Sequence, residues 1–333
     1  MKYNKLGRTG LDVSRLCLGC MTFGDPKSGA HPWTIGEEEA RPIFRQAVEN
    51  GMTFFDTSNS YSAGTSEVIV GKLVKEFTRR QEVVIATKAF FPPEGGISPA
   101  SAGKNIAGLS RKAVLSAVDE SLKRLGTDYI DLYQLHRWDY DTPIEETMEV
   151  MHDLVKSGKV RYIGASSMYA WQFAKAQEIA RKNGWTTFVS MQNYVNLLYR
   201  EEEREMIPLC KDQGVGLMTW SPLARGKLAR PVGTETQRSN TDEINKKLFS
   251  NTIEADNRVI RSVSQVADER GVPMAQIALA WVLRKPEVSS PIVGVSRPDQ
   301  LNDAIAALDI ELSDEEIRIL EEHYVPHSVM GHS

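Results

Sequence analysis

Short runs of β-branched and aliphatic residues alternate along this chain with longer segments of helical periodicity, and this alternation restricts the fold more than any other feature. Strands that alternate with helices form βα units, which assemble into parallel sheets covered by helices. The expected strands lie near Leu16–Leu18, Thr53–Asp56, Val83–Lys88, Ile130–Leu135, Tyr162–Ser166, Phe188–Gln192, Gly216–Trp220 and Ser290–Val293. The sequence therefore predicts an α/β protein of eight such units.

The expected helices fill the segments between these strands. They are Glu37–Asn50, Ser66–Phe77, Arg111–Leu125, Ile144–Ser157, Ala170–Asn183, Glu203–Gln213, Ala255–Arg270 with Met274–Arg284, and Asp299–Leu308. Local signals support several of these boundaries. For example, Pro143 stands directly before Ile144, where a helix tolerates proline, and Gly158 follows the end of the same segment, where a left-handed residue commonly stops a helix.

Two architectures share this alternation of strands and helices. An open, doubly wound sheet that binds a dinucleotide carries G-x-G-x-x-G after its first strand. This chain has no such motif, and its nearest approach, Gly214-Val215-Gly216, precedes a strand. Eight units without that motif favour a (β/α)8 TIM barrel. We expect residues 1–333 to form one such domain, with an N-terminal β-hairpin over Met1–Val13 and a C-terminal helix over Ser313–Glu322.

The composition argues against several classes of function. Lys and Arg number 40 against 44 Asp and Glu, for a net charge of −4, and the two signs are interspersed. Neither a nucleic-acid-binding surface nor a cationic membrane helix is indicated. The longest apolar run is far shorter than the ~20 residues that span a bilayer. Three cysteines form no disulfide framework, so we expect a cytoplasmic protein; nothing in the sequence bears on its oligomeric state.

Four residues suited to proton transfer lie at the ends of neighbouring predicted strands. Asp56 ends the second strand, Lys88 ends the third, His136 follows the fourth, and Tyr61 lies in the loop beyond Asp56. Consecutive strands of a barrel are neighbours, and its catalytic face is formed by their carboxyl ends. A nearby ammonium would lower the pKa of tyrosine from its usual value near 10. The set is typical of carbonyl reduction with a phenol as proton donor, and not of a metal site.

Other interpretations of the same residues stay open. A lysine at a barrel strand end can also form a Schiff base, as in an aldolase. Five aromatic residues could line an apolar substrate pocket, whereas Arg137 or Arg225 could accept a phosphorylated sugar. The aromatic residues are Trp33, Phe90, Phe91, Trp138 and Tyr169.

Two further patterns are interpreted as structural. Cys17 and Cys20 have the spacing of a redox pair, but strand residues three apart face opposite sides, so we expect no shared metal or disulfide. The charge run from Arg200 to Glu205 is interpreted as the solvated start of a helix.

Three segments resemble the catalytic motifs of the aldo-keto reductases: the run from Phe54 to Tyr61, Ala86-Thr87-Lys88 and Leu135-His136. The resemblance covers nearly the whole chain and extends to bacterial members and to potassium-channel accessory subunits. It implies NADPH-dependent reduction of small carbonyl substrates, with Tyr61 as general acid and Lys88 tuning it. Asp56 would be the partner of Lys88, and His136 would orient the substrate. A redox-sensing accessory subunit is the alternative that the resemblance leaves open.

The resemblance also implies a set of cofactor-binding residues. Ser166 and Gln192 would bind the nicotinamide carboxamide, and Trp220 would stack on the nicotinamide ring. Ser296 and Arg297, at a helix N-terminus, would bind the 2′-phosphate that distinguishes NADP from NAD. The full implied set is Gly19, Met21, Asp56, Ser166, Gln192, Trp220, Ser221, Pro222, Leu223, Arg225, Gly226, Arg238, Gly294, Ser296, Arg297, Gln300 and Asp303.

Overall fold

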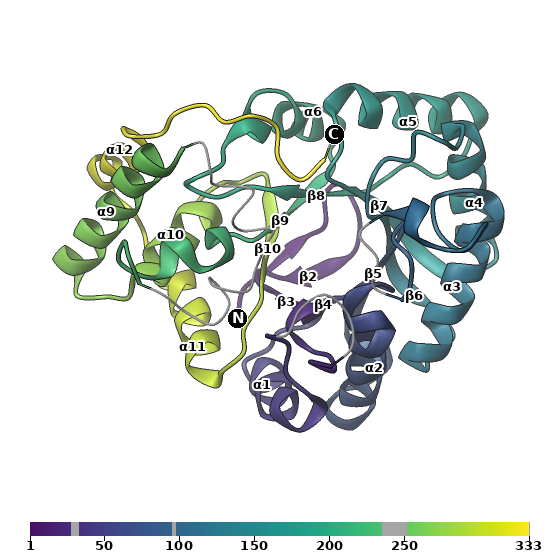
Figure 1. Cartoon of the computed structure of the whole chain (residues 1–333), viewed down its shortest axis with the longest axis horizontal. Helices are drawn as coiled ribbons and strands as arrows, with labels where there is room; N and C mark the ends of the chain where they lie inside the picture. The colour runs from purple at the N-terminus through teal and green to yellow at the C-terminus, as the bar shows by residue number, and fades with distance from the viewer. Residues whose placement is uncertain (28–32, 95–97, 235–251, 333) are drawn as a thin grey trace.

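Eight parallel strands form a closed barrel in the computed structural model, which describes residues 1–27, 33–94, 98–234 and 252–332 (Figure 1). Their order around the barrel is β10, β3, β4, β5, β6, β7, β8, β9. The strands are β3 (Cys17–Gly19), β4 (Phe54–Asp56), β5 (Val84–Ala89), β6 (Ile130–Leu135), β7 (Val160–Ser166), β8 (Ser190–Tyr194), β9 (Gly216–Trp220) and β10 (Val288–Val293). The predicted (β/α)8 barrel is confirmed.

Helices surround the barrel and cover the outer faces of the strands (Figure 1). In the described part of the chain they are α1 (Glu37–Glu49), α2 (Thr65–Phe77), α3 (Arg111–Leu125), α4 (Ile144–Lys156), α5 (Ala170–Asn183), α6 (Met206–Gln213), α9 (Ile253–Arg270), α10 (Met274–Leu283), α11 (Pro298–Ala306) and α12 (Asp314–Glu321). The predicted start of α6 at Glu203 is wrong. Proline has no N–H and is best tolerated in the first turn of a helix, so Pro208 is compatible with the observed start at Met206. None of the helices described is long and apolar enough to cross a membrane.

The N-terminal hairpin, β1 (Tyr3–Lys5) and β2 (Asp12–Ser14), closes the end of the barrel where the strands begin. The backbone N–H of Arg8 donates to the carbonyl oxygen of Gly214 at 2.8 Å. Gly7 has a φ of +58°, and a Cβ atom at this position would lie 2.6 Å from that same oxygen. Only glycine fits so close an approach in this conformation. The predicted hairpin is therefore present and caps the barrel.

The barrel interior changes from apolar to polar along the strands. Because alternate strand residues face the same side, Phe54 and Asp56 point inward while Phe55 packs against helices. Later inward positions on neighbouring strands hold Lys88 and Gln134. The first part of the interior is filled by Leu6, Val13, Cys17, Phe54, Val84, Ala86, Leu132, Met218 and Ile292. The carboxyl ends of the strands thus carry a buried polar cluster on an apolar base.

Cys17 and Cys20 are buried on opposite sides of the barrel wall, as the strand period predicts. Cys17 belongs to the interior cluster, whereas Cys20 packs among the surrounding helices. Both are free thiols, and burial raises the pKa of each well above the usual value. Neither is a reactive thiolate.

Candidate active site

Lys88 is the centre of a buried hydrogen-bond network at the end of β5. Its Nζ atom donates to Asp56 Oδ1 at 2.5 Å, to the carbonyl oxygen of Thr57 at 2.8 Å and to the Tyr61 hydroxyl at 3.2 Å. The Lys88 side chain is 0% exposed, so Asp56 rather than water compensates its charge. The fold therefore brings three of the four expected residues into direct contact.

Asp56 is held from its other side by two amides across the barrel. Gln134 Nε2 donates to Asp56 Oδ2 at 3.1 Å, and Gln192 Nε2 donates to the same oxygen at 2.9 Å. Sequence reasoning did not single out Gln134. The signal was available, because Gln134 lies two residues before His136 and so faces the same interior as the catalytic set.

His136 completes the cluster at the end of β6. Its backbone N–H donates to the carbonyl oxygen of Ala89 at 2.9 Å, and its Nδ1 lies 3.3 Å from the Ser58 hydroxyl. The edges of two rings flank the imidazole: Tyr61, with centroids 6.0 Å apart, and Phe91, with centroids 4.8 Å apart. Burial lowers the pKa of His136 well below its usual value, and the charges of Arg137 and Lys88 lower it further. The imidazole is neutral at physiological pH.

The pKa values of Tyr61 and Lys88 correct one expectation. Burial raises the pKa of the Tyr61 phenol above its usual value, and the Lys88 ammonium opposes this only in part. Burial lowers the pKa of Lys88, but Asp56 and Tyr61 outweigh that effect and leave it raised. The predicted net lowering of the Tyr61 pKa is wrong for this structure, because burial dominates. The resting site pairs a protonated phenol with an ammonium.

The residues expected at the nicotinamide lie at the ends of the next three strands. Ser166 ends β7, and its hydroxyl donates to the carbonyl oxygen of Gln192 at 3.0 Å. Trp220 ends β9, stacks on Tyr194 with centroids 4.2 Å apart, and donates from Nε1 to the Ser167 hydroxyl at 3.0 Å. Because Gln192 also binds Asp56, this group adjoins the buried cluster around Lys88.

The loop that follows β9 has an unusual backbone. Ser221, Ala224 and Arg225 adopt positive φ values of 49°, 48° and 55°, and Gly226 adopts 97°. Such conformations cost about 1–3 kcal/mol at a residue other than glycine and are concentrated at functional sites. Pro222 and Leu223 lie within the same turn. Arg238, expected further along this loop, lies outside the described residues.

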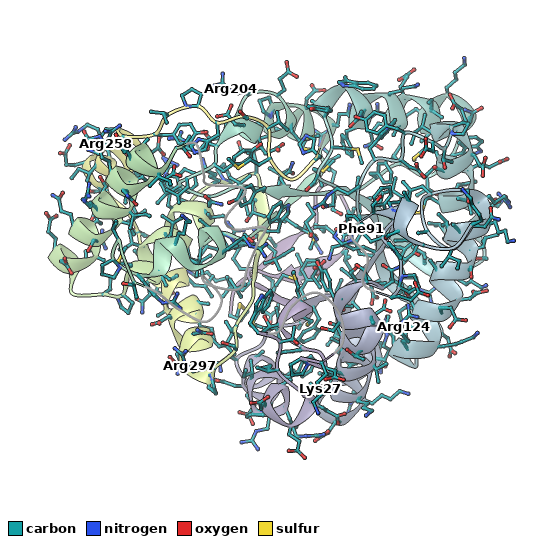
Figure 2. All side chains as sticks on the ribbon, in the orientation of Figure 1. Lys27, Phe91, Arg124, Arg204, Arg258 and Arg297 are labelled. Atoms are coloured by element: carbon teal, nitrogen blue, oxygen red, sulfur yellow. The ribbon has the colours of Figure 1, made fainter. Side chains whose placement is uncertain are left out.

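The residues expected at the adenosine end form contacts within their own turn. Arg297 is 61% exposed and donates to both carboxylate oxygens of Asp299, at 3.1 and 2.9 Å. The backbone N–H of Ser296 donates to Gln300 Oε1 at 2.8 Å. Asp303 Oδ1 instead accepts from Gln276 Nε2 of α10 at 2.9 Å. Figure 2 shows Arg297 at the outer edge of the molecule, whereas Phe91 lies near the centre of the view.

The ends of β3 and β10 connect these two regions. Gly19 ends β3 and is in register with Asp56 on β4. A Cβ atom on Gly19 would lie 3.5 Å from the backbone nitrogen of Gly294, which follows β10. Met21 lies in the short 3₁₀ turn after Gly19. The implied cofactor residues therefore extend from the centre of the mouth towards α11.

The C-terminal segment returns from α12 to the barrel mouth (Figure 1, yellow). The backbone N–H of Met330 donates to the Tyr199 hydroxyl at 3.0 Å, and the His332 ring packs edge-on against Tyr169 with centroids 4.7 Å apart. Further back, His327 Nε2 lies 3.1 Å from Asp256 Oδ1. The sequence did not predict this placement, because no periodic pattern marks the segment.

The prediction that the charge run before α6 is the solvated start of a helix is wrong for Glu201–Glu203. Glu201–Glu203 form a 3₁₀ turn that sends the acidic side chains to different neighbours. Glu201 accepts hydrogen bonds from Tyr324 and from the backbone of His327, and Glu203 pairs with Lys285 at 2.6 Å. Glu202 is buried. Glu201–Glu203 therefore connect the barrel to the C-terminal segment, whereas Arg204 and Glu205 are exposed.

Comparison with known proteins gives the family. A model of the Aldo/keto reductase family matches residues 15–325. The chain is 48% identical to the Versiconal hemiacetal acetate reductase of Aspergillus parasiticus, over 99% of this chain and 98% of that protein. It is 46% identical to a putative aryl-alcohol dehydrogenase of Schizosaccharomyces pombe, over 99% and 97%, and 41% identical to one of Saccharomyces cerevisiae, over 98% of each chain. The chain belongs to the aldo/keto reductase family and is an oxidoreductase.

These relatives also bear on two finer expectations. All three come from fungi, and each is named as a reductase or dehydrogenase. The expected resemblance to bacterial members and to potassium-channel accessory subunits is not supported by them.

Proposed function

We propose that this protein reduces aromatic aldehydes or ketones to alcohols with NADPH and with Tyr61 as the proton donor. The observation that carries the proposal is the buried Lys88 ammonium, held between the Asp56 carboxylate and the Tyr61 hydroxyl. A protonated phenol beside a fixed cation is an acid whose conjugate base is stabilised before it forms.

The residues of the cluster have distinct roles in this proposal. Tyr61 gives its proton to the carbonyl oxygen as negative charge develops there, and Lys88, 3.2 Å from the phenol oxygen, stabilises the resulting phenolate. Asp56 keeps Lys88 charged and oriented. The neutral His136 donates a hydrogen bond to the same carbonyl oxygen when its Nδ1 accepts the Ser58 hydroxyl.

NADPH supplies the hydride when bound, and the residues at the mouth fit it. Ser166 and Gln192 present polar groups beside the catalytic cluster, and Trp220 supplies an aromatic side chain at the end of β9, where it stacks on Tyr194. The loop from Ser221 to Gly226 carries the positive φ values typical of anion-binding turns. Arg297 is exposed and paired with an exposed carboxylate, so a phosphate can take the place of Asp299.

The same geometry argues against a Schiff-base aldolase. A lysine that attacks a carbonyl must be neutral and must have a free lone pair. The Lys88 nitrogen donates to three acceptors, and its pKa is raised above the usual value by Asp56 and Tyr61 despite its burial. It is a fixed cation rather than a nucleophile.

The choice of an aromatic substrate has two supports. The rings of Phe91 and Tyr61 flank His136, so an aryl group can pack beside the reacting carbonyl. The names of the relatives, a reductase of versiconal hemiacetal acetate and putative aryl-alcohol dehydrogenases, point the same way.

The test is a panel of substituted benzaldehydes, aryl ketones, aliphatic aldehydes and sugar phosphates, with turnover followed as loss of NADPH absorbance. We expect the benzaldehydes to give the highest kcat/KM. Turnover of sugar phosphates alone would contradict the aromatic substrate class. A protein that binds NADPH but reduces no carbonyl compound would contradict the enzymatic function.

A further inference from the structure

We infer that Arg137 selects aromatic carbonyl substrates that carry a carboxylate or another acidic oxygen on their ring. This inference rests on the proposed reductase function. It assigns Arg137 as a specificity-determining residue that contacts a part of the substrate remote from the reacting carbonyl.

Several partly buried arginines are held by carboxylates, whereas Arg137, like Arg15 at the other end of the barrel, donates to backbone carbonyl oxygens. Ion pairs with carboxylates hold Arg80 to Asp131 at 2.6 Å, Arg124 to Glu67 at 2.6 Å and Arg200 to Glu203 at 2.8 Å. In the described part of the chain no carboxylate pairs with Arg137, whose Nη1 donates instead to the carbonyl oxygen of His136 at 2.5 Å. Among the residues that the structure describes, this guanidinium at the mouth therefore has no carboxylate as counter-ion.

An unpaired, partly buried cation has an energetic cost. Burial lowers the pKa of Arg137 to about 10, so the group stays charged at physiological pH. Desolvation of a charge that lacks an opposite charge is unfavourable, and an anionic ligand offsets this cost. A guanidinium also presents several N–H donors in a plane, which suits a carboxylate.

The position of Arg137 relates it to the reaction. It follows His136 directly, and its Cζ atom lies 5.6 Å from the centroid of the Phe91 ring. Phe91 also contacts the His136 ring. The charge of Arg137 lowers the pKa of Tyr61 and of His332 of the C-terminal segment, so the guanidinium lies near both of these groups at the mouth.

These contacts define how a substrate would lie. A carbonyl oxygen that accepts from Tyr61 and His136 places an attached aromatic ring beside Phe91. Substituents on that ring then point towards Arg137. A carboxylate there would form charge-assisted hydrogen bonds in a site with little competing water.

The experiment compares pairs of benzaldehydes that differ in charge but not in shape. Carboxybenzaldehydes are matched with nitrobenzaldehydes, which are planar, similar in size and neutral. For each pair the readout is the ratio of kcat/KM values, carboxylate over nitro. Arg137→Met should lower this ratio about 10–100-fold relative to the unaltered protein, mainly through the KM of the carboxylate. Arg137→Lys should restore part of it.

Arg161→Met is the matched control. Arg161 also lies over an aromatic ring, 4.3 Å from the centroid of Tyr129, and donates to a backbone carbonyl, that of Gly158, at 3.0 Å. It stands near the start of β7, at the opposite end of the barrel. Its replacement should leave the ratio unchanged.

Other outcomes separate this inference from the proposed function. Equal losses for both members of a pair in Arg137→Met would show that Arg137 acts through His136, and would overturn the inference. If Arg137→Met leaves the kcat/KM of both members unchanged, the inference is overturned as well. If the unaltered protein reduces no aldehyde, the proposed function fails by itself. In that case calorimetric binding of 4-carboxybenzaldehyde, retained in Arg161→Met and lost in Arg137→Met, still supports the role of Arg137, and equal binding refutes it.

Discussion

The two sides of the barrel mouth hold their polar side chains in different ways. At the ends of β4, β5 and β6, Asp56, Lys88 and Gln134 are buried and bind one another across strands. At the start of α11, Arg297 is exposed and binds a neighbour two residues away. The first group is fixed by the barrel itself, and the second is held by a surface pair.

This difference separates two tasks. Buried groups that bind one another are in place before a substrate arrives, so no reorganisation is needed during proton transfer. A surface ion pair is worth at most about 1 kcal/mol and can be exchanged for a ligand. We infer that the chemistry is preorganised, whereas the selection of the cofactor depends on contacts that form on binding.

The largest expected effect comes from removing the hydroxyl of Tyr61, the proposed proton donor. Tyr61→Phe should lower kcat by about 10²–10⁴-fold, because the ring remains but its proton is lost. The dissociation constant for NADPH, measured by fluorescence titration, should stay within about twofold. Tyr3→Phe, at a tyrosine of the N-terminal hairpin, is the control and should behave as the unaltered protein. Full turnover by Tyr61→Phe would refute the assignment of the acid.

The second effect concerns stability and compares the two sides directly. Lys88→Met leaves the Asp56 carboxylate buried without its cation, and should lower the free energy of unfolding by about 3–5 kcal/mol. Arg297→Met removes an exposed ion pair and should change it by less than about 1 kcal/mol. Urea denaturation measures both. A double variant, Lys88→Met with Asp56→Asn, should recover part of the loss; equal losses for Lys88→Met and Arg297→Met would contradict the distinction.

A third effect tests the exposed side. Arg297→Ala should weaken NADPH binding about 10–100-fold, because a charge-assisted contact to the 2′-phosphate is lost, while NADH binding changes little. Arg318→Ala is a close match as a control, since Arg318 is 59% exposed and also binds a nearby carboxylate through two nitrogens. Equal weakening of NADPH and NADH would rule out the phosphate contact.

The smallest effect concerns a buried carboxyl with few partners. Burial raises the pKa of Glu202 from 4.5 to about 7, although Asn193 donates one hydrogen bond to it. Between these two pH values the folded chain binds more protons than the unfolded chain, so stability falls as pH rises through this window.

Glu202→Gln removes this dependence. The variant should match the unaltered protein near pH 4.5 and exceed its free energy of unfolding by about 3 kcal/mol near pH 8. The exposed Glu205, three residues along, serves as the control, and Glu205→Gln should follow the unaltered protein at both pH values. A Glu202→Gln variant less stable than the unaltered protein at pH 8 would show that the carboxylate is stabilised in a way its contacts do not explain.

The buried cluster at the ends of β4, β5 and β6 could be predicted from the sequence, because two simple rules determine which residues meet there. Consecutive strands of a parallel barrel are neighbours, and alternate residues face inward, so Asp56, Lys88 and Gln134 must meet. Counting by twos back from His136 would also have found Gln134. The direction of the Tyr61 pKa could not be predicted, because it depends on how completely the fold excludes water.

The structure of the rest of the mouth could not be predicted from the sequence, because this region is built from irregular backbone. The positive φ values of Ser221, Ala224 and Arg225 have no signature, since none of these residues favours that region. The run of charges from Arg200 is typical of a solvent-exposed segment, yet Glu202 is buried within a 3₁₀ turn. Contacts between the C-terminal segment and the barrel join residues more than a hundred positions apart, such as Met330 and Tyr199.

The contacts of Lys88 have a practical consequence for chemical modification. Amine-directed reagents acylate a lysine through its free, neutral nitrogen, and Lys88 is fully buried with its nitrogen donating to three oxygens. Exposed lysines such as Lys2, Lys5 and Lys123 should react first. The protein can therefore be attached to an amine-reactive support through its surface while the buried amine of Lys88 remains unmodified.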